Sequence, residues 1–315
     1  MIKEKLPNDK IYRYKVDGRF TDDLPGVTAY VMRDYSIGMH IQDFFEINIV
    51  TRGYGMHYIG EGCAAASVGD VFIIPPHVRH GYTGGKGFDV SHFIVSDGFI
   101  KHNFDILQRI PHFFTLFNAE PLMRAQSEDG ALHLKLENER FSKLLPYLYE
   151  MYANHKDMRL YYWDKISECR EISTLAIAKN IGLALYVITQ LCEAYGEYTN
   201  KVSKATESRD ANFMNTISLI HEKYSEKISL AELAKTARLS RSAFIKRFKT
   251  ITGMTPSDYI IKQRLDAAEN MLINTGYSVA DIAFKSGFYD SSHFSRSFSK
   301  ARGISPSEYR EKIKK

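Results

Sequence analysis

The spacing at which hydrophobic residues recur changes along the chain and divides it into regions. Between about residues 25 and 100, short runs of aromatic and β-branched residues alternate with Gly-containing turns, which is typical of β-strands. Examples of the expected strands are Val27–Met32, Phe44–Thr51, Met56–Ile59, Val71–Ile74 and Val90–Val95. Many short strands with regular turns predict an antiparallel barrel or sandwich.

From residue 137 to about 195 the apolar positions recur at helical spacing. They form two stripes, made of Leu144, Leu145, Leu148, Met151 and Tyr152, and of Ile181, Leu185, Ile188, Leu191 and Cys192. Each stripe predicts an amphipathic helix, and we expect the pair to pack on the barrel as a hairpin. Residues 196–209 are polar and without periodicity, so we place a linker there.

The C-terminal part of the chain contains the same pattern twice. The first copy comprises the segments 229–234, 242–248 and 253–256, and the second comprises 278–283, 292–298 and 303–306. Ser229 and Ser278 lie 49 positions apart, whereas Ser242 and Ser292 lie 50 positions apart. Each copy consists of a helix, a turn, a second helix and a Gly-x-[Thr/Ser]-Pro stop. This arrangement predicts two helix-turn-helix units and double-stranded DNA as the partner.

Capping residues stand at the expected helix ends. The expected caps and turn residues are Ser229 with Glu232 as a capping box, Ser240, Ser278 and Asp290 at the starts, and Gly253, Gly287 and Gly303 at the ends. Pro256 and Pro306 can open the following helices. Between the copies, Tyr259–Asn274 predicts one long helix with Ile260, Leu265, Ala268 and Leu272 inward. Its length would hold the two second helices about one DNA turn apart.

The second helix of each copy has two faces. Phe244, Phe248 and Ile251 in the first copy, and Phe294 and Phe298 in the second, are expected in the core. The opposite faces carry short polar groups and long cations, which can reach base edges in a major groove. The candidate DNA-binding residues are Arg241, Ser242, Ile245 and Lys246 in the first copy and Ser291, Ser292, His293 and Arg296 in the second.

Charge supports the same location for DNA binding. Residues 210–315 carry 18 Lys and Arg against 11 Asp and Glu, a net charge of +7. Residues 1–209 carry 24 against 26, a net charge of −2. The excess positive charge therefore lies with the repeated helices, where phosphates would be bound.

The repeated segments resemble the AraC/XylS-type transcription regulators. The matching residues are Phe248-Lys-x3-Gly253-x2-Pro256-x2-Tyr259-x4-Arg264-Leu265, Ile282-Ala283-x3-Gly287-Phe288-x5-Phe294-Ser-Arg296-x-Phe298 and Gly303-x-Ser305-Pro306-x2-Tyr309-Arg310. The resemblance implies that the positions of Ser242, Ile245, Lys246, Ser292, His293 and Arg296 face bases. It also implies RNA polymerase as a candidate partner and the two apolar stripes as a candidate homodimer seam.

Two further spacings lie in the strand-rich region, His40-x-Gln42-x3-Glu46-x6-Gly53 and Gly69-x5-Pro75-x-His77-x2-His80. They resemble the two motifs of the cupin barrel, which often precedes AraC-type DNA-binding units. Residues 40, 42, 44, 46 and 48 would share one face of an alternating strand. The expected effector-binding residues are therefore His40, Gln42, Phe44 and Glu46, with His80 and Tyr82 from another strand.

Cupin enzymes commonly bind a metal through His-x-His, Glu and a later His. Here Gln42 takes the place of the second His, and we expect neither a metal nor another cofactor, although His40, Glu46 and His80 remain a weak metal-binding candidate. The preferred ligand is a small, sugar-like effector, although the same side chains could simply fill the barrel interior without any ligand. For His92 we expect packing against its strand neighbours in preference to lining the pocket.

Composition excludes other classes. No run of about 18 apolar residues exists, so we expect no membrane-spanning helix, and the N-terminus lacks the apolar core of a signal peptide. Cys63, Cys169 and Cys192 have no metal or redox spacing, which favours reduced thiols in the cytoplasm.

These observations predict a multidomain α and β protein. The expected parts are a cupin-like antiparallel β-barrel in residues 1–136, a helical connector with a candidate dimerisation hairpin and linker in 137–209, and an all-α double helix-turn-helix in 210–315. The expected function is effector-controlled, sequence-specific transcription regulation, without enzymatic activity. Two competing hypotheses are a metal-dependent cupin enzyme, an isomerase or dioxygenase fused to a DNA-binding tail, and an architectural DNA binder without an effector.

Overall fold

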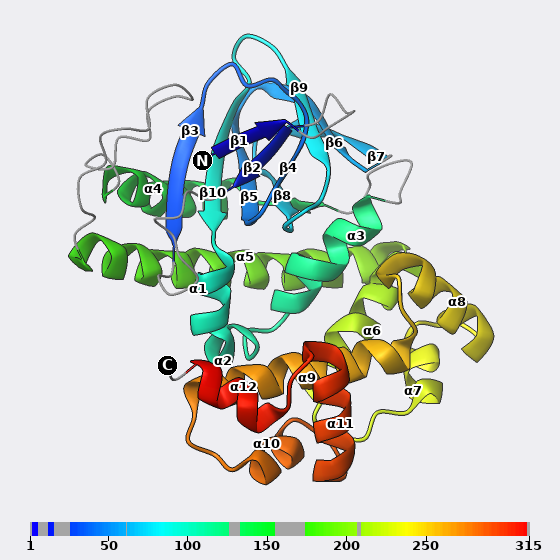
Figure 1. Ribbon diagram of the computed structural model, residues 1–315. Helices are drawn as coiled ribbons and strands as arrows, with labels where there is room; N and C mark the ends of the chain where they lie inside the picture. Colours follow the sequence, from blue (N-terminus) through cyan, green and yellow to red (C-terminus); the bar gives the residue numbers. More distant parts are fainter. Residues whose placement is uncertain are drawn as a thin grey trace. The chain divides into compact units, whose positions relative to one another are not determined.

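The computed structural model describes residues 2–5, 12–15, 26–60, 62–125, 133–154, 174–206 and 209–313. Contacts divide the chain into two compact units (Figure 1). The first unit comprises Met1–Asn103 and Ile110–Lys201, and the second comprises Phe104–Arg109 and Val202–Lys315.

The first unit is built on two β-sheets. The six-stranded sheet has the order β1 (Ile2–Lys5), β2 (Tyr12–Lys15), β4 (Ile37–Gln42), β9 (His80–Gly84), β6 (Tyr54–Ile59) and β7 (Gly62–Ser67). The five-stranded sheet has the order β11 (Leu134–Lys135), β8 (Asp70–Ile74), β5 (Phe45–Arg52), β10 (Asp89–Val95) and β3 (Val27–Met32). Neighbouring strands are antiparallel except for β2 and β4. The antiparallel β architecture expected for the N-terminal part is confirmed.

One apolar cluster joins the two sheets. Val50, Phe72 and Val90 come from the five-stranded sheet, and they share this cluster with Ala64 and Tyr82 of the six-stranded sheet. Burial of each large side chain contributes about 1.5–3 kcal/mol. The two sheets therefore pack face to face, and their inner side chains form the interior that holds the candidate site.

All five expected strands are present, with ends within two residues of those expected, and β9 is the further strand on which His80 and Tyr82 were expected. The strands β1, β2, β7 and β11 were not predicted. β7 consists of small residues, Gly-Cys-Ala-Ala-Ala-Ser, which lack the β-branched signature of a strand. In β9, an added Cβ at Gly84 would lie 2.4 Å from the carbonyl oxygen of Tyr35. The small residues therefore permit close approach of neighbouring backbones, a requirement that arises from tertiary packing.

The expectation of one alternating strand through residues 40–48 is wrong. The chain bends at Asp43 and Phe44, and β4 and β5 on either side belong to different sheets. His40 and Glu46 nevertheless both point inward, because the two sheets face each other. These residues therefore share an interior because two sheets pack together, and not because they alternate along one strand.

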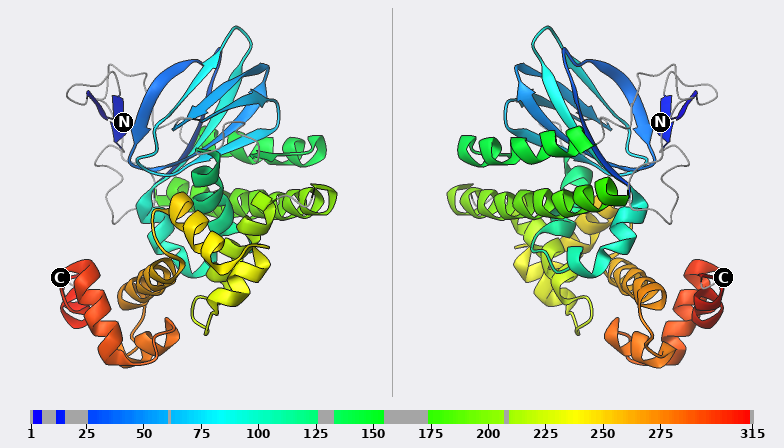
Figure 2. Two further views of the ribbon diagram at one scale, coloured as in Figure 1. Left: turned by 90° about the vertical axis from the view of Figure 1, so that its right-hand side faces the viewer. Right: turned by 90° about the vertical axis from the view of Figure 1, so that its left-hand side faces the viewer.

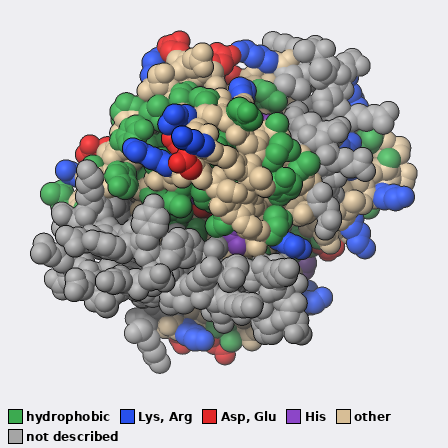
Figure 3. Space-filling view, turned by 90° about the horizontal axis from the view of Figure 1, so that it is seen from above, with side chains coloured by type: hydrophobic (Ala, Val, Ile, Leu, Met, Phe, Trp, Pro, Cys, Tyr) green, Lys and Arg blue, Asp and Glu red, His purple; other side chains and the backbone are tan. Residues whose placement is uncertain are grey.

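Helices follow and cover the sheets of the first unit (Figure 2). They are α1 (Asp97–His102), a π-helix (Thr115–Ala119), α3 (Glu120–Arg124), α4 (Asn138–Asn154) and the part of α5 (Thr174–Thr206) that ends at Lys201. The short elements before α4 were not predicted. On the face seen from above, hydrophobic side chains of described residues are mixed with charged ones of both signs (Figure 3).

The helices α4 and α5 run antiparallel, side by side. Near one end Arg140 Nη2 donates to Glu197 Oε1 over 2.8 Å, and near the other Asn154 Nδ2 donates to Asn180 Oδ1 over 2.9 Å. α4 also packs against β3. The two apolar stripes therefore make contacts within a single chain.

The linker placed at 196–209 needs correction, because α5 continues through Thr206. Gly196 does not interrupt this helix: an added Cβ would lie 2.7 Å from the His112 ring, so glycine permits close packing there.

The sequence predicted no membrane-spanning helix, but one segment of α5, Leu175–Lys201, is long and apolar enough to cross a membrane by length and composition. One such helix is weak evidence for a membrane span, and a third of its apolar segment is buried inside the protein.

The second unit is helical. It contains α2 (Phe104–Leu107), α6 (Arg209–Lys223), α7 (Leu230–Thr236), α8 (Arg241–Thr252), α9 (Pro256–Asn274), α10 (Val279–Lys285), α11 (Ser291–Arg302) and α12 (Pro306–Ile313). The long helix begins at Pro256, the residue expected to open it, three residues before Tyr259, and Thr255 Oγ1 caps it by accepting from the Asp258 N–H. The all-α double helix-turn-helix is confirmed.

Local signals explain these helix ends. The side chains of Ser240, Ser278 and Asp290 accept backbone N–H bonds at the starts of α8, α10 and α11. Gly253 and Gly303 end α8 and α11 in the left-handed conformation. At Ser229 the hydroxyl accepts from Ala231, but the return bond from the predicted Glu232 capping box is not formed within the described residues.

Candidate functional site

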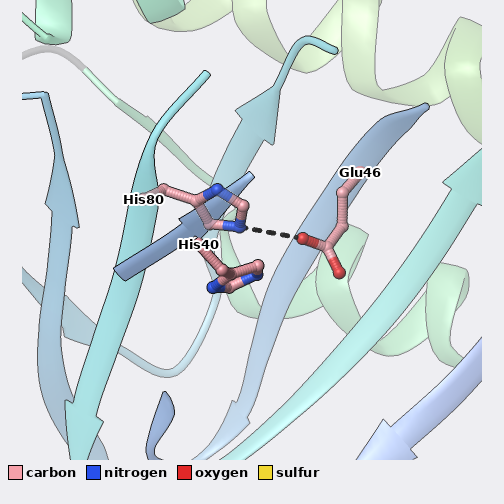
Figure 4. Close-up of side chains that lie close together, drawn as sticks. All are labelled: His40, Glu46 and His80. Atoms are coloured by element: carbon pink, nitrogen blue, oxygen red, sulfur yellow. Dashed lines mark hydrogen bonds and ion pairs between the residues drawn. The ribbon is translucent and has the colours of Figure 1, made fainter. Parts of the chain in front are cut away.

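The interior of the first unit contains a cluster of buried polar side chains. All six predicted effector-binding residues are at most 5% exposed, namely His40, Gln42, Phe44, Glu46, His80 and Tyr82. His40 on β4, Glu46 on β5 and His80 on β9 come together, with ligand atoms within 4.8 Å of one another (Figure 4). Three of the six predicted residues therefore meet in one place, although they belong to two sheets.

Glu46 lies between two imidazole rings. Its Oε2 is 3.1 Å from His80 Nε2, and its Oε1 is 2.8 Å from His92 Nδ1. Burial raises the pKa of Glu46, but the opposing charge of His92 and the hydrogen bonds of both histidines outweigh this and hold the pKa well below its ordinary value. Burial and the neighbouring charge of His80 lower the pKa of His40 to about 3. The cluster therefore combines a carboxylate with a neutral His40.

The His80 ring is oriented by the backbone. Its Nδ1 lies 3.1 Å from the carbonyl oxygen of Val78, and because a carbonyl only accepts, Nδ1 donates there. A proton must consequently lie between His80 Nε2 and Glu46. His40 is oriented in the same manner, with Nδ1 donating to the Gly38 carbonyl over 3.0 Å. The backbone thus directs the Nε2 side of both rings away from the strand.

These residues are chemically suited to a cation as well as to hydrogen bonding. Two imidazoles whose Nδ1 atoms donate to carbonyls, together with one carboxylate, form a donor set that suits a divalent transition metal. Within the described residues, His40, Glu46 and His80 are the group that could hold such an ion.

His92 belongs to the cluster through its bond to Glu46. Its ring also stacks on Tyr30 with ring centres 4.8 Å apart, and its edge meets Tyr35. The expectation that His92 packs against its neighbours in preference to lining the interior is therefore incomplete, because the residue does both.

His57 is a member of the interior that sequence analysis missed. It is fully buried on β6, and its ring lies 4.5 Å from the Tyr82 ring and 6.2 Å from the His80 ring. Arg124 Nη1 donates to its Nδ1 over 3.0 Å. Alternation within the expected strand Met56–Ile59, where Ile59 shares the face of His57, was the available signal.

Several polar atoms in this interior have no hydrogen-bond partner among the described residues. They are Gln42 Oε1 and Nε2, Asn48 Oδ1, His57 Nε2, His92 Nε2 and Thr28 Oγ1. Asn48 and His92 are direct neighbours in the pairing of β5 with β10, and both face inward. Each unpartnered buried group costs about 1–3 kcal/mol. Such a concentration of unpartnered atoms is typical of a site that binds a polar ligand.

A second candidate site lies on α8 and α11. Their aromatic residues Phe244, Phe248, Phe294 and Phe298 are fully buried, as expected. On the opposite faces, Arg241, Ser242, Lys246, Ser292, His293 and Arg296 are exposed, whereas Ile245 and Ser291 are partly buried. The eight candidate residues are therefore accessible on the helices that the sequence assigned to them.

Two family models match the chain. A helix-turn-helix domain matches residues 233–312, and an AraC-like ligand binding domain matches residues 25–155. The first match contains the candidate residues of α8 and α11, and the second contains the whole buried polar cluster.

The chain is similar to known proteins over most of its length. The HTH-type transcriptional activator RhaS of Enterobacter sp. (strain 638) is 26% identical over 274 residues, covering 86% of this chain and 87% of that protein. The Msm operon regulatory protein of Streptococcus mutans is 24% identical over 282 residues, covering 89% of each. A solved C-terminal domain of the response regulator yesN from Fusobacterium nucleatum is 29% identical and covers 30% of this chain and 94% of that chain, with a TM-score of 0.30. Both of these relatives are regulatory proteins, which favours transcription regulation over the hypothesis of a cupin enzyme.

Proposed function

Because the chain is an AraC-type transcription regulator with an N-terminal ligand-binding domain, we propose that an uncharged, hydroxyl-rich small molecule, such as a sugar, controls its sequence-specific binding to promoter DNA. The effector binds within the buried polar cluster of the first unit. α8 and α11 of the second unit read the DNA, and the protein acts in the cytoplasm. A second copy of the chain and RNA polymerase are further proposed partners.

The unpartnered buried atoms carry the proposal for the effector. Gln42, Asn48 and His57 offer uncharged donors and acceptors, which suit hydroxyl groups that both donate and accept. A ligand that satisfies them removes the desolvation cost of each atom. The cluster is thus prepared for several hydrogen bonds at once.

The charges of the cluster favour a neutral effector over an anionic one. Arg124 is the one buried Lys or Arg among the described residues, and its guanidinium is already bonded to Glu120, His57 and the Ile73 carbonyl. Glu46 adds a negative charge to the interior. The two histidines beside Glu46 are already paired with its carboxylate. A phosphate or carboxylate placed here would therefore be desolvated without a cation free to pair with it, which is costly.

Regulation requires that the effector favour one arrangement of the protein over another. The chain offers a direct covalent route, since α5 begins in the first unit and its last segment, Val202–Thr206, belongs to the second. Effector binding in the interior would shift the population of arrangements in which α8 and α11 are presented to DNA.

A thermal-unfolding screen of the full-length protein tests the effector class. The screen compares neutral sugars with their phosphorylated forms, and each ligand is measured with the wild type and with Gln42→Leu. A neutral ligand at 100 times its Kd stabilises the wild type by about 2.7 kcal/mol, and Gln42→Leu loses this gain because its amide is gone. Tyr54→Ala, on an exposed site of β6, is the control that retains it. Stabilisation by phosphorylated sugars alone would contradict the proposed class.

A further inference from the structure

The two helix-turn-helix copies differ by one residue in the turn. The bond from the Leu239 N–H to the Ala234 carbonyl recurs as the bond from Phe288 to Ala283, each 2.9 Å long and 49 positions apart. The N-caps that follow, Ser240 and Asp290, are 50 positions apart. The additional residue of the second copy must therefore lie between Phe288 and Asp290, and it is Tyr289.

The preceding turn is the same in both copies. Arg238 and Gly287, which are again 49 positions apart, both adopt a positive φ, of 52° and 91°. Leu239 is then partly buried, and Phe288 is only 3% exposed. The insertion consequently leaves the core contacts of the turn unchanged and affects only the segment that leads into α11.

Tyr289 is 93% exposed, although its ring is large and mostly apolar. Its position is nevertheless well defined. Asp290 Oδ1 accepts from the His293 N–H over 2.6 Å directly after it. Before it, an added Cβ at Gly287 would lie 2.6 Å from Ser225 Cα, so the turn is held against neighbouring backbone. The phenol is thus presented outward from a fixed turn at the start of α11.

We propose that Tyr289 is a DNA-positioning residue, whose hydroxyl donates to a backbone phosphate beside the base pairs read by α11. This inference rests on the proposed DNA binding. Residues at the start of a recognition helix reach base edges, and phosphate oxygens are commonly contacted by tyrosine side chains and by helix N-termini. Because the first copy has no residue at this position, the second copy gains a backbone contact that the first lacks.

A tyrosine contact to a phosphate can be distinguished from a lysine contact by its effect on salt dependence. A phenol carries no charge, so its bond to a phosphate releases no counterion and does not change the salt dependence of binding. A lysine–phosphate contact does change it. A backbone contact also carries no base preference, so its loss weakens binding to every sequence equally.

The test uses full-length protein and two duplexes of equal length, one enriched from a randomised pool by the wild type and one of mixed sequence. Tyr289→Phe removes only the hydroxyl, and Tyr289→Ala removes the ring as well. We expect each variant to bind both duplexes about tenfold more weakly, as for one hydrogen bond to a charged group, with an unchanged salt slope. The control Tyr54→Ala, 84% exposed in the first unit, binds as the wild type does.

Three results would overturn the proposal in distinguishable ways. If both Tyr289 variants bind as tightly as the wild type, Tyr289 makes no contact, while wild-type binding still supports the proposed function. If Tyr289→Ala changes the enriched bases, the contact is to a base and not to the backbone. If the wild type enriches no sequence and binds neither duplex, the proposed DNA reading fails and the inference fails with it.

Discussion

Arg124 Nη1 donates a hydrogen bond to His57 Nδ1 over 3.0 Å, and both side chains are buried. Since an arginine cannot accept, His57 carries its proton on Nε2. Burial and then the charge of Arg124 hold the pKa of His57 well below its ordinary value, so the ring stays neutral. His57 therefore presents an N–H donor to the interior from a ring fixed by α3.

Replacing Arg124 with Ala tests this arrangement. The substitution leaves Glu120 buried without its cation, and His57 Nδ1 without its donor. Loss of one partner of a buried ion pair costs about 3–5 kcal/mol, and urea unfolding followed by amide exchange in β6 and β8 measures it. Lys143→Ala removes an exposed i,i+4 ion pair with Glu139 and should leave exchange unchanged. Equal effects of the two variants would contradict the role of Arg124.

The buried His221 should make the stability of the second unit fall at acidic pH. His221 Nε2 lies 2.8 Å from the Tyr259 hydroxyl, and burial, followed by the charge of Lys262, lowers its pKa to about 3. Unfolded histidine binds a proton below about pH 6.5, whereas the folded one does not until about pH 3. Stability is therefore full above pH 6.5 and falls toward pH 3, by at most about 1.4 kcal/mol per pH unit.

His221→Gln should flatten that decline, because glutamine does not titrate. Urea unfolding of the helical unit at several pH values between 6.5 and 4 gives the slope for each protein. A variant whose stability falls as steeply as that of the wild type would show that His221 is not the responsible group.

Two glycines of the second unit share a positive φ but differ in their surroundings. An added Cβ at Gly287 would meet the Ser225 backbone at 2.6 Å, whereas at Gly253 it would meet nothing within 4 Å. Gly253→Ala should cost about 1 kcal/mol, from left-handed strain alone. Gly287→Ala adds a backbone clash and should cost at least about 1–3 kcal/mol more. Thermal unfolding compares them, and similar losses would contradict the close approach at Ser225.

Metal removal should leave effector binding intact. The proposed hydrogen bonds come from side chains such as Gln42, Asn48 and His57 and need no ion. Protein dialysed against EDTA should therefore show the same effector-induced stabilisation as untreated protein. Elemental analysis showing one bound iron, manganese or zinc, lost in His80→Ala together with effector binding, would instead assign His40, Glu46 and His80 to a metal.

The two helix-turn-helix copies and the long helix between them could be predicted from the sequence, because their signals are local, whereas α2 and α6 of the same unit were not predicted. Ser240, Asp290 and Gly253 each act within a few residues of the helix end that they define. In the β unit, five strands and the motif residues were found, but the order of the strands in two sheets depends on distant pairing and was not predicted. His57 and Arg124 lie 67 positions apart, and no local pattern relates them. The bend at Asp43 and Phe44 likewise depends on which sheet each strand joins.

Sequence-specific reading of DNA by both α8 and α11 is the central claim. Selection of duplexes from a randomised pool, with full-length wild type and Arg296→Ala, tests it most directly. The wild type should enrich two base clusters about 10 base pairs apart. Arg296→Ala should lose the preference at one position and bind about 1–3 kcal/mol more weakly. Enrichment of no bases by the wild type, or an identical selected sequence and affinity for Arg296→Ala, would contradict the assigned reading.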